Sequence, residues 1–264
     1  MKSEKVLLTM ILLWLTSLNS FAGFEVVGNL SYKYIAQKGE KYSTVIKVHN
    51  TGSKDQEVKI YLRDYLFNYE GTTFYNEPGT NNRSNAPWIQ FSAQTLLLKS
   101  NETQNLQIEI TVPKGDNITG TYWSMLMLEG LVPSDQNAQV QLKLNTAIRY
   151  AIQMVTHIGK SGIGQLEFQR PGVVKEGNKQ FFDFIMVNTG ERSISPEVSM
   201  ELFDAATGES VKVLKIPKQG MYPTTSTKWR FPLEGLPKGR TYKAVIVADG
   251  SGEDVFGLEY TIVL

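Results

Sequence analysis

The feature that most constrains this chain is a recurring alternation of apolar and polar residues with a period of two. Such runs cover residues 42–48, 58–62, 106–112, 140–144, 198–202 and 241–248. Alternation of this kind puts apolar side chains on one face of a half-buried β-strand, whereas a helix needs a period of 3.6. Turn signals rich in Gly, Pro and Asn separate the runs. The sequence therefore predicts an all-β fold.

Two short signatures occur twice and in the same order, which indicates an internal duplication. The segment VHNTG at residues 48–52 is echoed by MVNTG at 186–190, and VPKG at 112–115 is echoed by LPKG at 236–239. We therefore expect two Ig-like β-sandwich domains, spanning residues 24–158 and 163–264. The boundary is expected within the Gly-rich segment 159–172. The polar segment 70–85 is expected to be a long loop.

The first 22 residues have the pattern of a secretory signal peptide. Lys2 and Lys5 precede an apolar run over residues 6–18, and Ser20 and Ala22 occupy the small-residue positions before a cut. The run is shorter than the ~20 apolar residues that a membrane span requires. We therefore expect cleavage after Ala22 and export, with no membrane span in the mature chain.

Composition excludes several classes of site. The chain has no cysteine and two histidines, so disulfide frameworks, Cys-ligated metal sites and three-His zinc sites are excluded. It carries 27 Lys and Arg against 26 Asp and Glu, and removal of the signal peptide leaves 25 of each sign. A neutral chain has no electrostatic reason to bind nucleic acid. We expect no cofactor and no metal.

Candidate catalytic groups are few. The sequence has neither a nucleophile elbow nor a phosphate-binding Gly loop, and His49 and His157 are interpreted as structural. Asp249, Glu253 and Asp254 lie in a Gly-rich loop where a calcium site is conceivable. Their spacing does not match the EF-hand pattern, so an ordinary polar hairpin loop is preferred.

One region resembles a known family. From Pro113 the chain runs through an apolar strand with Tyr122 and Trp123, then a Pro-containing loop, then a strand of sequence VQLKL at 140–144. Upstream, PWI at 87–89 is followed by LLL at 96–98 and SNE at 100–102. This order resembles the first domain of the PapD-like periplasmic chaperones of pilus assembly, over most of residues 25–155. The Pro and Gly of that family's LxPG motif are absent.

The resemblance implies a non-enzymatic periplasmic chaperone that caps pilus or surface-structure subunits by β-strand donation. An outer-membrane usher is implied as a further partner. Val140, Leu142 and Leu144 match the donated apolar side chains, and Arg149 matches the basic residue that anchors a subunit carboxylate. The second basic anchor falls on Lys33 or on Tyr34, and because side chains alternate faces the two choices differ.

Two other functions remain open from the residues themselves. The alternation at residues 140–144 is also what any half-buried strand shows. An exported Ig-like adhesion or scaffold protein would keep that strand paired or covered. The chaperone hypothesis predicts instead an exposed apolar edge at residues 140–146, with Arg149 facing the cleft between the domains. A hydrolase would require paired carboxylates, and no such spacing is present.

Overall fold

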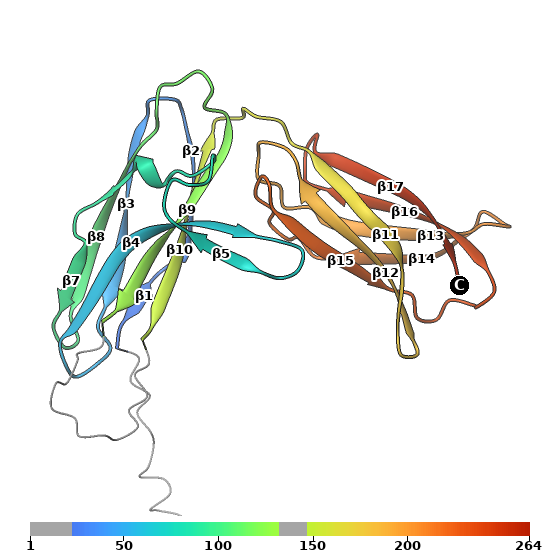
Figure 1. Ribbon diagram of the computed structural model, residues 1–264, viewed down its shortest axis with the longest axis horizontal. Coiled ribbons are helices and arrows are strands. Elements are labelled where there is room, and N and C mark those ends of the chain that lie inside the picture. Colours follow the sequence, from blue (N-terminus) through green and yellow to red (C-terminus); the bar gives the residue numbers. More distant parts are fainter. Residues whose placement is uncertain (1–22, 132–146) are drawn as a thin grey trace, which may run out of the picture.

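The computed structural model describes residues 23–131 and 147–264, which form two β-sandwiches joined by a short linker at residues 159–165 (Figure 1). The predicted all-β fold with two Ig-like domains is confirmed. Within the described residues, the single helical turn is a 3-10 turn at Ala86–Trp88. The two sandwiches meet at an angle, and the chain ends in the second one (Figure 1).

Among the described residues, the first sandwich contains ten strands in two sheets. One sheet has the order β1-β3-β8-β6, and the other has the order β2-β10-β9-β4-β5, with β7 also paired to β4. The strands are β1 (Glu25–Val27), β2 (Ser31–Ala36), β3 (Lys41–His49), β4 (Gln56–Phe67), β5 (Thr73–Asn76), β6 (Ile89–Phe91), β7 (Thr95–Leu98), β8 (Thr103–Thr111), β9 (Gly120–Gly130) and β10 (Arg149–Ile158).

The chain crosses between these two sheets near its start. Strand β1 pairs with β3 in one sheet, and β2 pairs with β10 in the other. Gly28 between them has a φ of 119°, a backbone conformation that residues with a Cβ rarely adopt. Because of this crossing, β2 reaches only the second half of β10, from Gln153 to Ile158.

The core of the first sandwich follows from the alternation in its strands. Ile46 and Val48 of β3, Leu106 and Ile108 of β8, and Leu126 of β9 are fully buried in one cluster. Strand β9 differs from the other strands because almost every residue along it is buried. It lies between β10 and β4, and residues on both of its faces are buried. Its sequence accordingly reads as a continuous apolar run.

The second sandwich has seven strands in two sheets, of order β11-β12-β15 and β14-β13-β16-β17. The strands are β11 (Leu166–Glu176), β12 (Lys179–Asn188), β13 (Glu197–Asp204), β14 (Ser210–Ile216), β15 (Ser226–Pro232), β16 (Thr241–Asp249) and β17 (Val255–Val263). Trp229, Phe182 and Phe184 are buried in its core. Tyr242 at the start of β16 donates from its hydroxyl to the Pro237 carbonyl, 3.1 Å away, which is the tyrosine-corner geometry of Ig-like domains.

The duplicated signature has the same structural role in both domains. Asn50 follows β3 and Asn188 ends β12, and both side chains are fully buried. The Asn50 amide donates to three backbone carbonyls, and the Asn188 amide donates to the carbonyls of Arg192 and Met221. Each Asn also accepts the N–H of the glycine two residues later. The repeat is therefore conserved in geometry as well as in sequence.

Removal of this buried amide is expected to destabilise the second domain. Asn188→Ala removes three side-chain hydrogen bonds, of which two join backbone groups that keep a second partner, and we expect a loss of about 1–3 kcal/mol in the free energy of unfolding. Urea denaturation measures this loss. The matched control is Asn178→Ala at an exposed turn, where a change within about 0.5 kcal/mol is expected. Equal losses in both variants would contradict the assigned role of Asn188.

One expectation about a connecting segment was wrong. Segment 70–85 is not a plain loop, because β5 lies within it and forms a hairpin with β4. The buried Asp64 carboxylate organises the rest of it by accepting from the backbone of Gly79 and Asn81 and from the Ser84 hydroxyl. The linker at residues 159–165 lies inside the segment 159–172 in which the boundary was expected, and residues 170–172 of that segment belong to β11, at a β-bulge.

Candidate functional site

The first candidate feature is a free strand edge at the start of β10. The Ile148 carbonyl accepts from the Gly130 N–H, so even-numbered residues of this strand bond toward β9. Gln153 donates the other way, to the Leu30 carbonyl. Odd-numbered residues therefore point their backbone groups away from β9. In the described part of the chain no strand covers that side before Gln153, so Arg149 and Ala151 present main-chain groups at an open edge.

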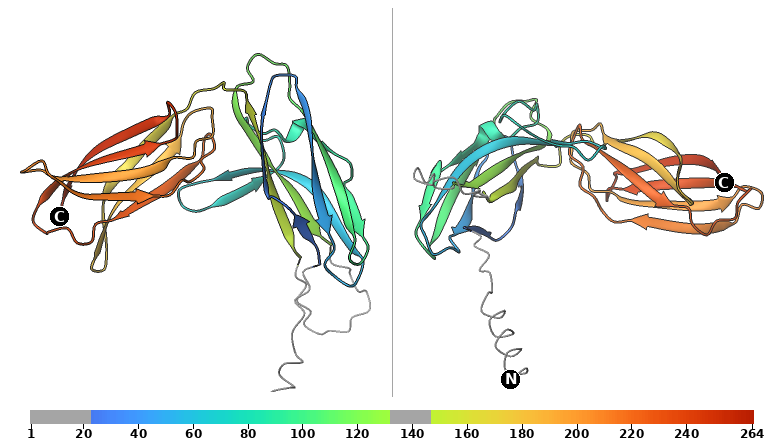
Figure 2. Two further views of the ribbon diagram at one scale, coloured as in Figure 1. Left: turned by 180° about the vertical axis from the view of Figure 1, so that it is seen from behind. Right: turned by 60° about the horizontal axis from the view of Figure 1, so that its bottom comes forward.

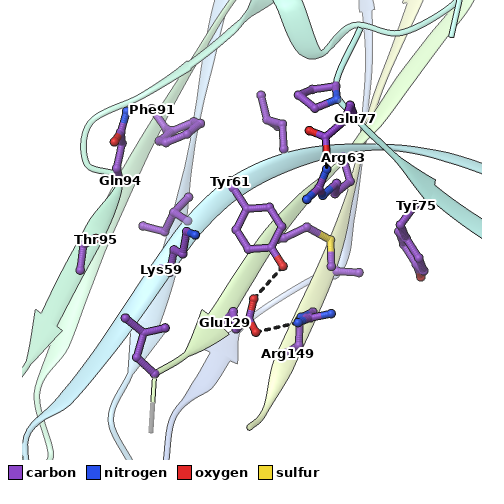
Figure 3. A pocket seen from close by; sticks show the side chains of 16 residues that line it. Lys59, Tyr61, Arg63, Tyr75, Glu77, Phe91, Gln94, Thr95, Glu129 and Arg149 are labelled. Atoms are coloured by element: carbon purple, nitrogen blue, oxygen red, sulfur yellow. Dashed lines mark hydrogen bonds and ion pairs between the residues drawn. The ribbon is translucent and has the colours of Figure 1, made fainter. Parts of the chain in front are cut away.

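The side chains of this edge line an open groove of about 1040 Å³ on the outer face of the sheet (Figure 3). Tyr61, Glu129 and Arg149 stand in a row across β4, β9 and β10. The Arg149 guanidinium donates to the Glu129 carboxylate at 2.6 Å, and the Tyr61 hydroxyl donates to it at 2.8 Å. These two donors hold the pKa of the Glu129 carboxyl below its usual range. The row fixes the Arg149 side chain at the start of the open edge.

The second candidate feature is a cleft of about 620 Å³ between the two sandwiches. Lys33 of β2 and Gln153 of β10 line it from the first domain, and Tyr222 and Lys228 line it from the second. Tyr222 stacks on Trp123 of β9 with ring centroids 4.7 Å apart, and its hydroxyl donates to Gln153 at 3.2 Å. Burial raises the pKa of Tyr222. The cleft thus has aromatic walls and two lysines.

The hairpin formed by β4 and β5 reaches across to the second sandwich beside this cleft (Figures 1 and 2). At its tip the Tyr69 N–H donates to the Ser226 hydroxyl at 3.1 Å, and Arg170 donates to the Tyr69 hydroxyl at 3.3 Å. The Arg170 guanidinium also lies 5.7 Å from the centroid of the Tyr69 ring. The hairpin therefore connects the two domains and lines one side of the cleft.

The structure does not bring the two expected anchors together. Lys33 is aligned with Val155 of β10, six residues along the strand from Arg149. At ~3.3 Å per residue this separation is ~20 Å, so the two side chains cannot bind one carboxylate. The expectation that Arg149 faces the cleft between the domains is wrong. Arg149 lies at the end of β10 opposite the linker.

The same geometry distinguishes Lys33 from Tyr34. Lys33 is exposed and lines the cleft, whereas Tyr34 turns inward and packs on the Tyr42 ring at 4.7 Å. Sequence reasoning did not identify Gln153 and Tyr222 as cleft residues. No local pattern marks them, because they come together only when the two domains dock.

Three of the expected site residues, Val140, Leu142 and Leu144, lie outside the described residues, as does the expected signal peptide. Their numbers have the same parity as Ile148, Tyr150, Ile152 and Met154, which pack in or against the core of the first sandwich.

The remaining candidate features of the described residues are the 249–254 loop, groups of metal-ligating side chains and long apolar helices. The Asp254 carboxylate in the 249–254 loop is engaged by the Arg192 guanidinium at 2.7 and 2.9 Å. Nowhere in residues 23–131 and 147–264 do three His, Cys, Asp or Glu side chains gather as a metal site would require. Within the same residues no helix is long and apolar enough to cross a membrane.

Comparison with solved structures finds similar chains. A chain from a chaperone–tip adhesin complex of CFA/I fimbriae biogenesis aligns with a TM-score of 0.50 and 14% identity, over 92% of this chain and 99% of that chain. The class 5 fimbriae chaperone CfaA aligns with a TM-score of 0.48, 12% identity and coverage of 91% and 99%. A chain from the CsuC–CsuE chaperone–tip adhesion subunit pre-assembly complex of Acinetobacter baumannii aligns with a TM-score of 0.46 and 15% identity, over 90% of this chain and 98% of that chain.

No family model and no curated protein sequence matches this chain. The first of the structural alignments covers both sandwiches and nearly the whole of the aligned chain. The predicted likeness to the two-domain fold of pilus-assembly chaperones is therefore confirmed at the level of structure.

Proposed function

We propose that this chain is a non-enzymatic exported chaperone that caps pilus or surface-structure subunits through strand pairing at β10. The observation that carries the proposal is the open edge at Arg149 and Ala151, whose main-chain groups point away from β9 with no covering strand among the described residues. Soluble proteins normally protect such edges because they invite pairing with another chain. An exported adhesion or scaffold protein has no evident need for one.

The physical basis of capture is β-augmentation. A strand from a subunit gains main-chain hydrogen bonds along the edge, and alternate side chains fill pockets that give specificity. The crossing of the first strand at Gly28 supports this role, because it leaves β2 beside only the second half of β10. The first half therefore remains available for an incoming strand.

We propose that Val140, Leu142 and Leu144 supply the donated apolar side chains. They precede the open edge in sequence and share the parity of Ile148 and Tyr150. In a strand continuous with β10, residues of one parity face one side. These three side chains would then extend the apolar face of the first sandwich into a subunit that lacks a strand.

The two basic residues take separate roles in this proposal. Lys33 lines the cleft between the domains, where an ammonium group can hold the terminal carboxylate of a subunit. Arg149 lies at the start of the open edge, where its guanidinium can contact the incoming strand itself. The site of action is the periplasm, reached after cleavage behind Ala22, and an outer-membrane usher would receive the loaded chaperone.

Co-expression with the exported proteins encoded beside its gene tests the function. We expect one of them to purify with this chain as a one-to-one complex and to aggregate or be degraded when expressed alone. The proposal fails if each of these proteins is stable without the chain. It also fails if the complex forms equally well with a truncated protein in which residues 132–152 are replaced by a Gly-Ser linker.

Substitution of the two basic residues tests their separate roles. Lys33→Ala and Arg149→Ala are each expected to weaken subunit binding by about 10-fold, because each removes a charge-assisted hydrogen bond. In the double variant, subunit binding is expected to weaken by the product of the two single fold-changes, because residues ~20 Å apart act independently. Lys47→Ala on the opposite sheet is the matched control and is expected to bind normally. Titration calorimetry against the purified subunit measures all four, and unchanged binding by either single variant would refute the role assigned to that residue.

A further inference from the structure

The joint between the two sandwiches is centred on a fully buried threonine. The Thr121 N–H donates to the Glu191 carbonyl of the second domain at 2.9 Å. The Ser193 N–H, also from the second domain, donates to the Thr121 hydroxyl oxygen at 2.9 Å. That same oxygen lies 3.0 Å from Nδ1 of His157 on β10. One hydroxyl therefore connects a histidine of the first domain to the backbone of the second.

The protons of this cluster can be assigned from its donors and acceptors. A threonine hydroxyl has one proton, and its oxygen here already accepts from Ser193. With a neutral ring, Nδ1 of His157 is an acceptor, and the Thr121 proton satisfies it. With a protonated ring both nitrogens are donors. The Thr121 oxygen has two lone pairs and would then accept from both the Nδ1–H and the Ser193 N–H, so the proton of this buried hydroxyl would lose its acceptor.

The charges around His157 also favour the neutral ring. A small pocket of about 230 Å³ beside it is lined by Lys160 and Arg192, and among the described residues no carboxylate lines it. Two acidic groups of the second domain at this joint are already paired, Glu191 with Arg83 at 3.1 Å and Asp254 with Arg192 at 2.7 Å. Burial, followed by the charge of Lys33 on β2, lowers the pKa of His157.

We propose that His157 is an acid-sensitive latch of the domain joint. With its ring neutral it completes the Ser193–Thr121 contact and holds the two sandwiches docked. Protonation leaves the buried Thr121 hydroxyl proton without an acceptor and adds a positive charge near Lys33 and Lys160, which loosens the joint. The proposal concerns the chain by itself and does not depend on a partner or on the chaperone function.

The direction of the pH effect follows from linkage. When the joint opens, His157 becomes solvated and returns toward its usual pKa of 6.5, whereas in the docked state its pKa is lower. The open state therefore binds the proton more readily. The contribution of the latch is complete above pH 6.5 and is lost as the pH falls from there through the lower pKa of the docked state.

Because the chain has no native cysteine, two introduced cysteines can be labelled uniquely. Spin labels at Lys47→Cys and Lys243→Cys, both on exposed strand positions, report the distance between the domains by pulsed electron resonance. The distance distribution is expected to be narrow at about pH 7.5 and clearly broader at an acid pH, below the lowered pKa of His157, at which its ring is protonated. His157→Gln is expected to abolish this pH dependence. His49→Gln, which removes the only other histidine, is expected to retain it.

Nitrogen-15 spectra of the unmutated protein report the tautomer and protonation of the His157 ring. This second measurement does not require that a variant at position 157 folds. The ring of His157 is expected as the Nε2–H tautomer at neutral pH, titrating below 6.5. An Nδ1–H tautomer at neutral pH would overturn the proposal. Equal broadening in His157→Gln would also overturn it, as would an unchanged distance distribution at a pH where the spectra show the ring protonated.

Discussion

The Ala151→Pro variant is expected to remain folded and to lose subunit binding by on the order of 100-fold, about 2.7 kcal/mol. The N–H of Ala151 points toward the open edge and takes no part in pairing with β9. Proline removes this donor and puts a ring carbon where an incoming strand must approach. Proline is tolerated in a strand where the missing N–H would face solvent. The binding function should therefore be lost while the fold is kept.

Ala151→Ser is the matched control for this prediction. It changes the side chain but keeps the N–H, so binding within about 3-fold of the native protein is expected if main-chain pairing carries the affinity. Circular dichroism and thermal unfolding confirm that both variants are folded. If Ala151→Pro binds as well as Ala151→Ser, the subunit does not pair with this edge.

Gly120→Ala is expected to disrupt the domain joint and to lower the free energy of unfolding by about 2–4 kcal/mol. Gly120 has a φ of 75°, which costs a residue with a Cβ about 1–2 kcal/mol. A Cβ at this position would also collide with the Glu191 carbonyl of the second domain. The hydrogen bond between the Thr121 N–H and this carbonyl would then be lost as the domains move apart.

Gly208→Ala is the matched control that separates the cost of the positive φ from the cost of the collision with the Glu191 carbonyl. Gly208 has the same φ of 75°, and a Cβ there would meet nothing within 4 Å. It should therefore show the backbone cost alone, with an unchanged distance between the domains in the spin-label measurement. If Gly120→Ala is no more destabilising than Gly208→Ala and leaves the distance between the domains unchanged, Glu191 does not dock against Gly120.

Much of the fold could be predicted because the determining patterns are local. Alternation at residues 42–48 and 198–202 became β3 and β13, with the apolar residues Ile46 and Val198 fully buried. The repeated Asn-Thr-Gly signature marked equivalent turns because a buried Asn side chain must satisfy nearby backbone groups in each domain. The sequence did not predict β5 because each residue of Thr73–Asn76 is exposed and the segment lacks the alternating apolar face that identifies a strand.

The site was predicted less well because its geometry is not local. Arg149 was correctly associated with the last strand of the first domain, but its position relative to the cleft depends on where β10 ends and the linker begins. Lys33 reaches the cleft because Gly28 moves the chain from one sheet to the other, which shifts β2 beside Val155. Trp123 and Tyr222 stack across the joint, and they are 99 positions apart in the sequence.

Amide hydrogen exchange, with and without the purified subunit, tests the pairing of β10 most directly. In the free chain the amides of Arg149 and Ala151 face the open edge and should exchange fast, whereas the Gln153 amide is bonded to the Leu30 carbonyl and should already be protected. Subunit binding is expected to slow exchange at Arg149 and Ala151 by about 10-fold or more, with little change at Gln153. Unchanged exchange at Arg149 and Ala151 in a saturated complex would contradict strand pairing at β10.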